Sequence, residues 1–309
     1  MSERGSPFGP MTLICNARAG RGGVAKALPE VVRRLDERGL SHRIVHTEGA
    51  GHATELARAA LRSGSRFLVA VGGDGTIHEI VNGMIEGDAP INPDAVLGVV
   101  AAGTGSDFIK TFGLPNLPAH AVAHLDGGES FPIDVGKITY TEGGRERIRY
   151  FPNIAEVGLG AAVVDRAARL PRWLGPTVYL VAFWLSILRH RAARARVDLV
   201  DRTYEGPMNN MVVANGQYFG GGMKIAPKAA PTDGLLDVQI EHARKREAIA
   251  IIPKIFKGEH VPHPDILEAK RVRLSIETDP PMLIEADGEV LGTTPARFEL
   301  LRDVIRLKV

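Results

Sequence analysis

Cysteine is almost absent from this 309-residue sequence, which contains only Cys15. A single cysteine excludes an intrachain disulfide and any metal site built from several cysteines, and it suits a reducing cytoplasm. The first residues, MSERGSPFGPMTLIC, include an acid and two prolines where a signal peptide needs an uninterrupted apolar core. We therefore do not expect export, and we expect a cytoplasmic location.

Long apolar runs and a strong charge bias are also missing. The most apolar stretch, Val178–Leu188, has about half of the roughly 20 residues that a membrane-spanning helix needs. The net charge of +2 carries no signature of nucleic-acid binding. These absences favour a soluble protein, or one that binds at most to a membrane surface, with no nucleic-acid partner.

The sequence does contain enough apolar residues for two folded domains. Its 44% hydrophobic and 24% charged residues are typical of globular proteins, and its length exceeds that of one ordinary domain. Strand and helix patterns alternate three times within the first ~110 residues, which predicts a parallel sheet with helical crossovers. Strand patterns dominate from near Phe131 onward and predict antiparallel sheets.

The predicted fold is thus a combination of α/β and β architecture. We predict a three-layer α/β domain with a mainly parallel sheet over residues 1–130. A strand-rich, β-sandwich-like domain is predicted over residues 131–309. The last predicted strand, residues 301–309, could also pack back near the first domain.

Three glycine-rich turns follow predicted strands of the first domain: Asn16–Gly23 (NARAGRGG), Gly72–Gly75 (GGDG) and Ala101–Phe108 (AAGTGSDF). The carboxyl ends of parallel strands meet at one edge of a sheet, where ligands bind. Glycine lets the backbone approach a phosphate, and a following helix offers unpaired N–H groups. However, Asp74 would repel a phosphate unless a cation or a donor intervenes, and the spacing fits neither the dinucleotide fingerprint nor the P-loop. The turns predict a nucleotide site of another kind.

The GGDGT motif at Gly72–Thr76, with Glu79, Val81, Asn82 and Gly83 after it, resembles the nucleotide motif of the diacylglycerol kinase catalytic-domain family. GGDGT alone also occurs in NAD kinases and phosphofructokinase-like enzymes. Further segments are similar to the family's motifs, in the family's order: Asn16–Gly22, Gly103–Phe108, Gly220–Val238 and Ile284–Glu289. Together the matches span roughly Leu13 to Glu289, nearly the whole chain.

The resemblance implies that ATP binds to the first domain. Glycine amides and hydroxyls suit phosphate oxygens and ribose. For Thr47, a role in the turn that begins the next helix is equally open. The residues that would line the ATP site by motif position are Asn16, Ala17, Arg18, Ala19, Gly20, Arg21, Thr47, Gly72, Gly73, Asp74, Gly75, Thr76, Glu79, Gly103 and Thr104.

Asp287 and Glu289, in the segment ADGE, are the candidate catalytic acids. If the segment is extended, residues two apart face the same side, so both carboxylates could enter one cleft. Asp-Gly is also a strong signal for a solvated hairpin turn. The resemblance implies that this motif supplies the general base and part of a metal network. We favour Glu289 as the proton acceptor, with Asp287 close behind, and the sequence does not separate the two.

Other acids match the family's acidic network and a magnesium site. Asp74, Asp107 and Asp134 correspond to the network, although Asp107 could be a helix cap and Asp134 an ordinary residue at the end of a strand. Asp233 matches a largely structural Mg²⁺ site, with the carbonyl groups of Ala230 and Leu235 as further ligands. A simple turn before the strand LLDVQI is the other interpretation of Asp233.

The sequence departs from the family's usual pattern at three positions. Ser106 replaces asparagine, which puts the fine geometry of the acceptor side in doubt, and Arg21 replaces lysine but keeps the charge. His78 stands where asparagine is common. We expect His78 to lie on the surface of a helix, without a catalytic role.

The resemblance implies an ATP- and Mg²⁺-dependent lipid kinase that phosphorylates a hydroxyl of diacylglycerol or a related lipid. An NAD kinase-like or other small-alcohol kinase is one alternative, and a non-catalytic ATP-binding regulator is another. The apolar segment 170–196, with arginines that include Arg172, Arg189 and Arg191, would suit peripheral contact with an anionic membrane, although a buried helix is also open. A monomer and a homo-oligomer are both compatible with the sequence.

Overall fold

The computed structural model describes residues 6–17, 19–101, 106–116, 120, 122–171, 177–243 and 245–309. The chain divides into two compact units, Met1–Val135 with Leu301–Val309, and Gly136–Leu300. Arg18, Gly103, Thr104 and Arg172 lie outside the described residues, as does the side chain of Arg21.

A parallel sheet with the strand order β17-β6-β3-β1-β2 forms the centre of the first unit. Every residue of β1, β3 and β6 is buried, as expected for strands covered on both faces. The sheet strands are β1 (Met11–Cys15), β2 (His42–His46), β3 (Phe67–Gly72), β6 (Val96–Ala101) and the end of β17 (Glu289–Lys308). A short separate hairpin consists of β4 (Ile85–Glu86) and β5 (Ala89–Pro90).

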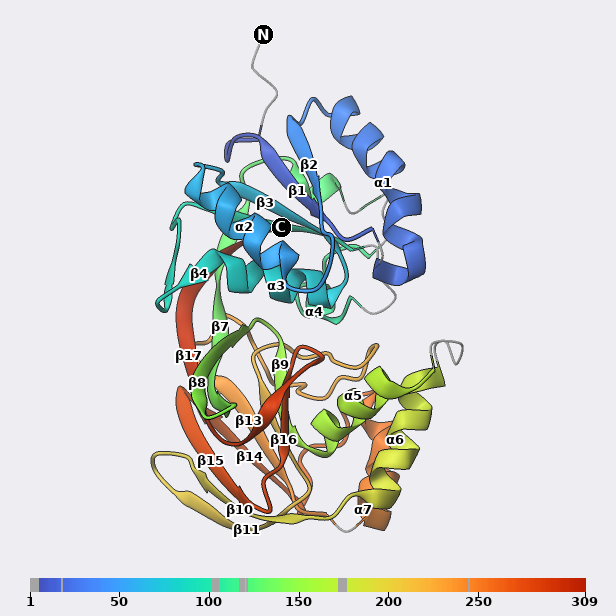
Figure 1. Cartoon of the computed structure of the whole chain (residues 1–309), viewed down its shortest axis with the longest axis vertical. Coiled ribbons are helices and arrows are strands. Elements are labelled where there is room, and N and C mark those ends of the chain that lie inside the picture. The colour runs from blue at the N-terminus through green and yellow to red at the C-terminus, as the bar shows by residue number, and fades with distance from the viewer. Residues whose placement is uncertain are drawn as a thin grey trace. The chain divides into compact units, whose positions relative to one another are not determined.

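Helices cover both faces of this sheet. Figure 1 shows α1 (Ala19–Glu37) on one face, and α2 (His52–Arg62) and α3 (Asp74–Met84) on the other. Val24, Val31 and Leu35 of α1 share a hydrophobic cluster with Leu13 and Cys15, which are alternate residues of β1. The prediction of a three-layer α/β fold is therefore confirmed. Two shorter helices, α4 (Asp107–Thr111) and the 3-10 helix η1 (Ala123–Leu125), complete the unit among the described residues.

The expectation that His78 lies on a helix surface is wrong. His78 is completely buried in α3. This helix packs against α2 as well as against the sheet, so residues on most of its sides are buried. The side-chain amide of Asn82, one turn further on, donates a hydrogen bond of 2.8 Å to the backbone carbonyl of His78.

Antiparallel strands form the second unit. One run has the order β14-β13-β12-β9-β16-β17, and another the order β11-β10-β15-β17. The strands are β7 (Ser130–Glu142), β8 (Arg145–Phe151), β9 (Ile154–Gly158), β10 (Ala193–Asp198), β11 (Thr203–Met208), β12 (Asn210–Ala214), β13 (Leu236–Glu241), β14 (Ile266–Arg271), β15 (Arg273–Asp279), β16 (Leu283–Ala286) and β17.

The core of the second unit lies between these strand runs. Ala195 and Val197 of β10 are buried, while the charged residues that alternate with them are exposed. They share one hydrophobic cluster with Val213 and Val238, which belong to the other run. Such alternation with a shared core is the pattern of a sandwich, so the predicted β-sandwich-like fold is confirmed.

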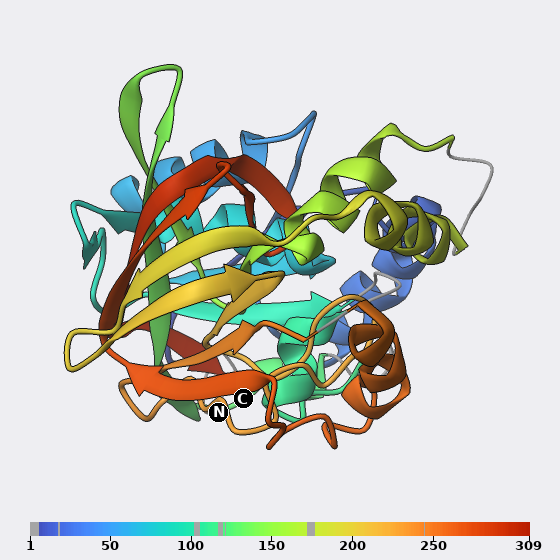
Figure 2. The same ribbon diagram turned by 90° about the horizontal axis from the view of Figure 1, so that it is seen from below.

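Helices α5 (Leu159–Arg169), α6 (Val178–Arg189) and α7 (Lys245–Ile255) accompany the strands of the second unit. α5 and α6 are packed side by side and can be followed in both Figure 1 and Figure 2. Across the described part of the chain, no helix is both long enough and apolar enough to cross a membrane.

Strands β7 and β17 each contribute residues to both units. In the second unit β17 pairs with β15 and β16, and near its end Arg306 pairs with Val96 of β6 in the first unit. Residues 301–309 thus belong to the α/β unit by their hydrogen bonding, although they come last in the described chain.

Candidate functional site

The GGDGT segment forms a tight turn from β3 into α3. Gly73 precedes the helix with an extended backbone, and no side chain caps the helix start. A Cβ atom at Gly72 would lie 2.3 Å from the hydroxyl of Thr76, so only glycine fits there. Gly75 is exposed, and a Cβ placed on it would meet no atom within 4 Å. The first turn of α3 is therefore open to a ligand, and its N–H groups favour an anion.

Asp74 joins this turn to the third one. Its two carboxylate oxygens accept hydrogen bonds from the backbone N–H groups of Asp107 (3.0 Å) and Phe108 (3.1 Å), at the start of α4. The negative charge of Asp74 is thus engaged by two donors, which is the condition under which a phosphate can approach the turn.

The other two network acids are buried and have partners of their own. The carboxylate of Asp107 accepts a bond of 2.6 Å from the ammonium group of Lys110. Asp134 accepts a bond of 3.0 Å from the backbone N–H of Asp303, a residue of β17 with a positive φ of 53°. The carboxylate of Asp74 thus contacts the backbone N–H of Asp107 in α4, whereas Asp134 holds the end of β17 in place.

Glu79 has a position that sequence reasoning missed. Its two oxygens accept bonds of 2.9 Å from the N–H groups of Gly51 and Ala53, at the start of α2. Gly51 has no side chain that could cap this helix, so Glu79 of α3 supplies the cap. Its part in ATP binding stays a prediction. The spacing along the chain carries no signal for a cap supplied from another helix.

The first glycine turn begins where β1 ends. The N–H of Asn16 donates to the carbonyl of Val71 in β3 (3.1 Å), and the N–H of Ala19 donates to Asn16 (3.0 Å). Thr47 follows β2 and donates from its N–H to the carbonyl of Cys15 (3.0 Å). Asn16, Thr47 and Gly72 therefore lie at the same edge of the sheet. Ala17 and Gly20 are half-buried within the first turn and the start of α1.

Ser106, the departure before α4, adopts a left-handed conformation with φ 46° and ψ 48°. Asparagine occupies this region more readily than serine does. The serine side chain is buried, and its hydroxyl has no hydrogen-bond partner among the described residues.

The ADGE segment is a hairpin turn, which is the interpretation that the Asp-Gly signal indicated, and it is not extended. Asp287 and Gly288 have φ angles of 49° and 88°, and they connect β16 to β17. Asp287 is anchored to the first residue of β9: its N–H donates to the carbonyl of Ile154 (2.8 Å), and its carboxylate accepts from the N–H of Ile154 (2.9 Å). Glu289 is 36% exposed, with a carboxylate oxygen 3.8 Å from the guanidinium of Arg149.

A pair of buried glutamates lies directly behind this turn. Glu285 is a cross-strand neighbour of Glu156, and both are buried. Glu285 accepts a bond of 2.7 Å from the N–H of Gly288, and Glu156 accepts one of 2.9 Å from the side-chain amide of Asn210. The pair thus supports the hairpin that carries Asp287 and Glu289.

Burial raises the pKa of Glu156 to about 7, although the hydrogen bond from Asn210 lowers it. The pKa of Glu285 is raised well above its usual value, mainly by burial and then by the charge of Glu156. Because two buried carboxylates on neighbouring strands repel each other when both are ionised, the pair keeps a proton near neutral pH. Sequence reasoning missed the pair, although Glu156 is the one charged residue in the apolar run NIAEVGLG.

Replacement of Glu156 by glutamine should change how stability depends on pH. Because the folded-state pKa of about 7 exceeds the ordinary 4.5, the stabilising contribution of the proton is full below pH 4.5 and is lost as the pH rises through about 7. Glutamine resembles the protonated acid at every pH. Urea unfolding should therefore show Glu156→Gln gaining up to about 3 kcal/mol relative to wild type across this range. The exposed Glu259→Gln is the control, and parallel wild-type and Glu156→Gln curves would contradict the assignment.

Asp233 does not fit a divalent cation as its surroundings stand. Its carboxylate accepts a bond of 2.7 Å from the ammonium group of Lys270 and one of 3.0 Å from the N–H of Leu235. The carbonyl of Ala230 accepts from the N–H groups of Thr232 (2.7 Å) and Asp233 (3.1 Å). Lys270 therefore supplies the positive charge that a magnesium ion would bring, and an ion bound there would have to displace it.

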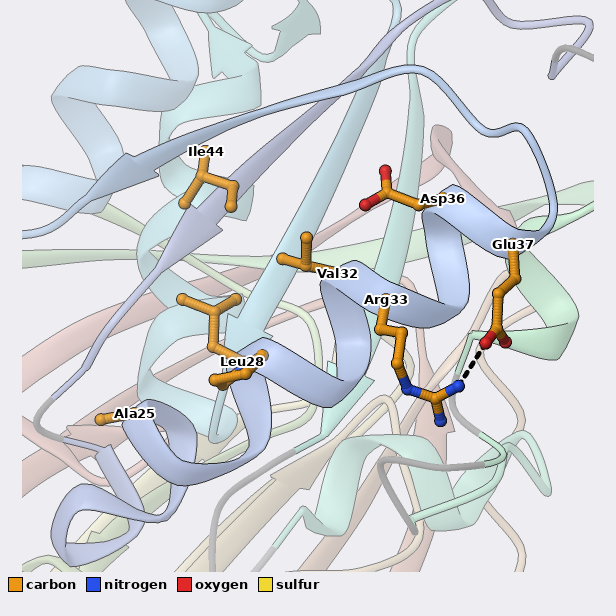
Figure 3. A pocket seen from close by; sticks show the side chains of 8 residues that line it. Ala25, Leu28, Val32, Arg33, Asp36, Glu37 and Ile44 are labelled. Atoms are coloured by element: carbon orange, nitrogen blue, oxygen red, sulfur yellow. Dashed lines mark hydrogen bonds and ion pairs between the residues drawn. The ribbon is translucent and has the colours of Figure 1, made fainter.

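No group of three or more histidine, cysteine or acidic side chains among the described residues is arranged to hold a metal ion. A cavity of about 600 Å³ lies between α1 and β2, lined by residues that include Leu28, Val32 and Ile44 (Figure 3). None of its lining residues was predicted to bind ATP, so it lies outside the predicted site.

Two family models match the chain. The diacylglycerol kinase catalytic domain matches residues 10–138, and the YegS C-terminal NAD kinase beta sandwich-like domain matches residues 153–309. The chain therefore belongs to the diacylglycerol kinase family, and by that membership it is a lipid kinase.

Relatives in several bacteria are similar over most of their length. A diacylglycerol kinase of Mycobacterium tuberculosis (strain CDC 1551 / Oshkosh) is 30% identical, with 96% of each chain covered. One from Bacillus subtilis (strain 168) is 29% identical over 93% of this chain and 91% of its own. Crystal structures from Bacillus anthracis str. Sterne, described as diacylglycerol kinases, match with TM-scores of 0.79 (25% identity, 97% and 94% covered) and 0.71 (23%, 97% and 96%).

Proposed function

We propose that this enzyme transfers the γ-phosphate of ATP to a hydroxyl of diacylglycerol or a related lipid. In this proposal the first unit binds the nucleotide and the second unit presents the lipid hydroxyl. The observation that carries the nucleotide part is the open first turn of α3, beside which the charge of Asp74 is engaged by two backbone N–H groups. An open helix start of this kind favours a phosphate.

Glu289 takes the proton of the lipid hydroxyl in this proposal. The half-exposed carboxylate of Glu289 supports the role, because a general base must reach the acceptor hydroxyl. Asp287, in contrast, forms hydrogen bonds to the backbone of Ile154 through one carboxylate oxygen and its N–H. These bonds suit a residue that positions the hairpin.

Magnesium bound together with ATP would supply positive charge where the phosphoryl group is transferred. In this proposal Asp74 and Asp107 would complete its coordination, and the ion would displace the ammonium group of Lys110 from the carboxylate of Asp107. Asp233, Ala230 and Leu235 take no part in the transfer in this proposal. The enzyme would work in the cytoplasm, on lipid at the inner face of the membrane.

A labelled-ATP assay tests the proposal directly. The purified protein is given γ-labelled ATP and Mg²⁺ with a water-dispersed short-chain diacylglycerol, a sphingoid base or NAD. We expect label in phosphatidate. Label in NAD phosphate alone would instead support the small-alcohol kinase, and tight ATP binding by calorimetry without transfer to any acceptor would support the regulator.

A further inference from the structure

Helix α6 presents apolar side chains to solvent. Leu180, Trp184 and Leu188 are 59%, 44% and 73% exposed, and their spacing of four residues places them along one side of the helix. Ala182 and Ile187, by contrast, are buried. The interpretation of a buried helix therefore describes only one face of α6, and the other face leaves apolar side chains exposed. A row of large exposed apolar residues marks an interaction surface.

A basic cavity lies at the end of the same helix. It has a volume of about 240 Å³ and is lined by residues of α5, α6, β16 and the segment before β10. Four of its lining residues are basic, Arg166, Arg189, His190 and Arg191, and none is acidic. The guanidinium of Arg166 donates a bond of 3.0 Å to the hydroxyl of Ser186, which holds it in place.

The arginines at this cavity are available for an anion. Neither Arg189 nor Arg191 forms an ion pair with any residue that the structure describes, and both are exposed. Arginine binds phosphate groups through two parallel N–H bonds. Positive charge beside a row of leucine and tryptophan is the combination that binds the surface of an anionic membrane.

We propose that α6 and this cavity form a docking face for an anionic lipid bilayer. Leu180, Trp184 and Leu188 enter the boundary between headgroups and acyl chains, and Arg189 and Arg191 bind lipid phosphates. With 12 residues, α6 is about 18 Å long, so it lies in the interface and does not span it. The inference rests on the proposed function, because a diacylglycerol acceptor resides in the membrane.

Vesicle sedimentation tests this docking face. Wild type should sediment with phosphatidylcholine vesicles that contain phosphatidylglycerol, much less with pure phosphatidylcholine, and less in high salt. Leu180→Glu/Leu188→Glu should lower the binding constant about tenfold or more. Arg189→Glu should lower it at least about fivefold. Val200→Glu, at an exposed apolar residue of the β10–β11 turn, and Arg145→Glu, in β8, are the matched controls and should bind like wild type.

Activity on the water-dispersed diacylglycerol separates this inference from the proposed function. All of these variants should phosphorylate it at the wild-type rate, whereas the α6 variants should lose turnover on diacylglycerol within anionic vesicles. If wild type phosphorylates no lipid but sediments as described, the proposed function fails and the docking face stands. Sedimentation of the α6 variants like wild type, or capture of wild type by neutral and anionic vesicles alike, would overturn the docking face.

Tryptophan fluorescence tests the docking face without any substitution in α6. The chain has two tryptophans, so Trp173→Phe leaves Trp184 as the only one. Anionic vesicles with bromine on the acyl chains should quench its emission, because the indole lies at the acyl boundary. Unchanged emission would overturn the proposal. Relief of binding by inorganic phosphate, at an ionic strength at which chloride leaves binding intact, would overturn it in favour of a soluble anion.

Discussion

Replacement of Glu289 by glutamine is expected to lower kcat for lipid phosphorylation by about 10²- to 10⁴-fold, the range for loss of a general base. Glutamine keeps the size of the side chain but cannot take the proton of the acceptor hydroxyl. The affinity for ATP should stay within about twofold of wild type, because that site belongs to the first unit in our proposal. Steady-state kinetics with short-chain diacylglycerol and calorimetric titration with ATP measure the two quantities.

Asp287→Asn is the matched variant for this experiment. The amide oxygen of asparagine can still accept the bond from the N–H of Ile154, and asparagine tolerates the positive φ at this position. We therefore expect a much smaller loss of kcat than in Glu289→Gln. The opposite order, with Asp287→Asn inactive and Glu289→Gln active, would make Asp287 the base and reverse the assignment.

Asp74→Ala is expected to have the second large effect. It removes both acceptors from the N–H groups of Asp107 and Phe108, so α4 loses its cap and the second and third glycine turns separate. The free energy of unfolding should fall by about 1–3 kcal/mol, the range for a lost cap with charge-assisted bonds. ATP affinity should fall about tenfold or more, because the turns that approach the phosphates are no longer held together.

Urea unfolding and ATP titration follow these two effects separately. Asp94→Ala, at an exposed aspartate of the same unit, should change neither. If Asp74→Ala lowers stability but binds ATP like wild type, Asp74 is a helix cap and no part of the nucleotide site.

Local patterns in the sequence were enough to predict the two architectures and the GGDG turn from β3 into α3, whereas α1 begins at Ala19, inside the predicted turn Asn16–Gly23. Runs that are apolar on every residue, such as FLVAVG, indicated covered parallel strands, and the alternation in ARARVD belongs to an open face. The predictions that failed concern residues whose surroundings come from segments distant in the sequence. His78 is buried because α3 packs against α2 as well as against the sheet, whereas a helix that packed only against the sheet would leave its other face exposed.

The candidate site shows the same limit. GGDGT identified its turn, but the sequence did not reveal that Asp74 caps α4 or that Glu79 caps α2, since both bonds join separate elements. Glu156 and Glu285 meet only because β9 and β16 are neighbours in the sheet. The ion pair of Asp233 with Lys270 likewise depends on a strand far along the chain, so the sequence did not reveal that a lysine occupies the predicted metal ligand.

Strand β17 also determines when the first unit can finish folding during synthesis. The strand end that pairs with β6 is made only after all of Gly136–Leu300 has been translated. At ordinary rates of translation that interval is on the order of ten seconds. Throughout it, β6 is an unprotected edge whose N–H and C=O groups can pair with another nascent chain. The exposure of this edge therefore depends on the speed of translation as well as on the stability of the finished sheet.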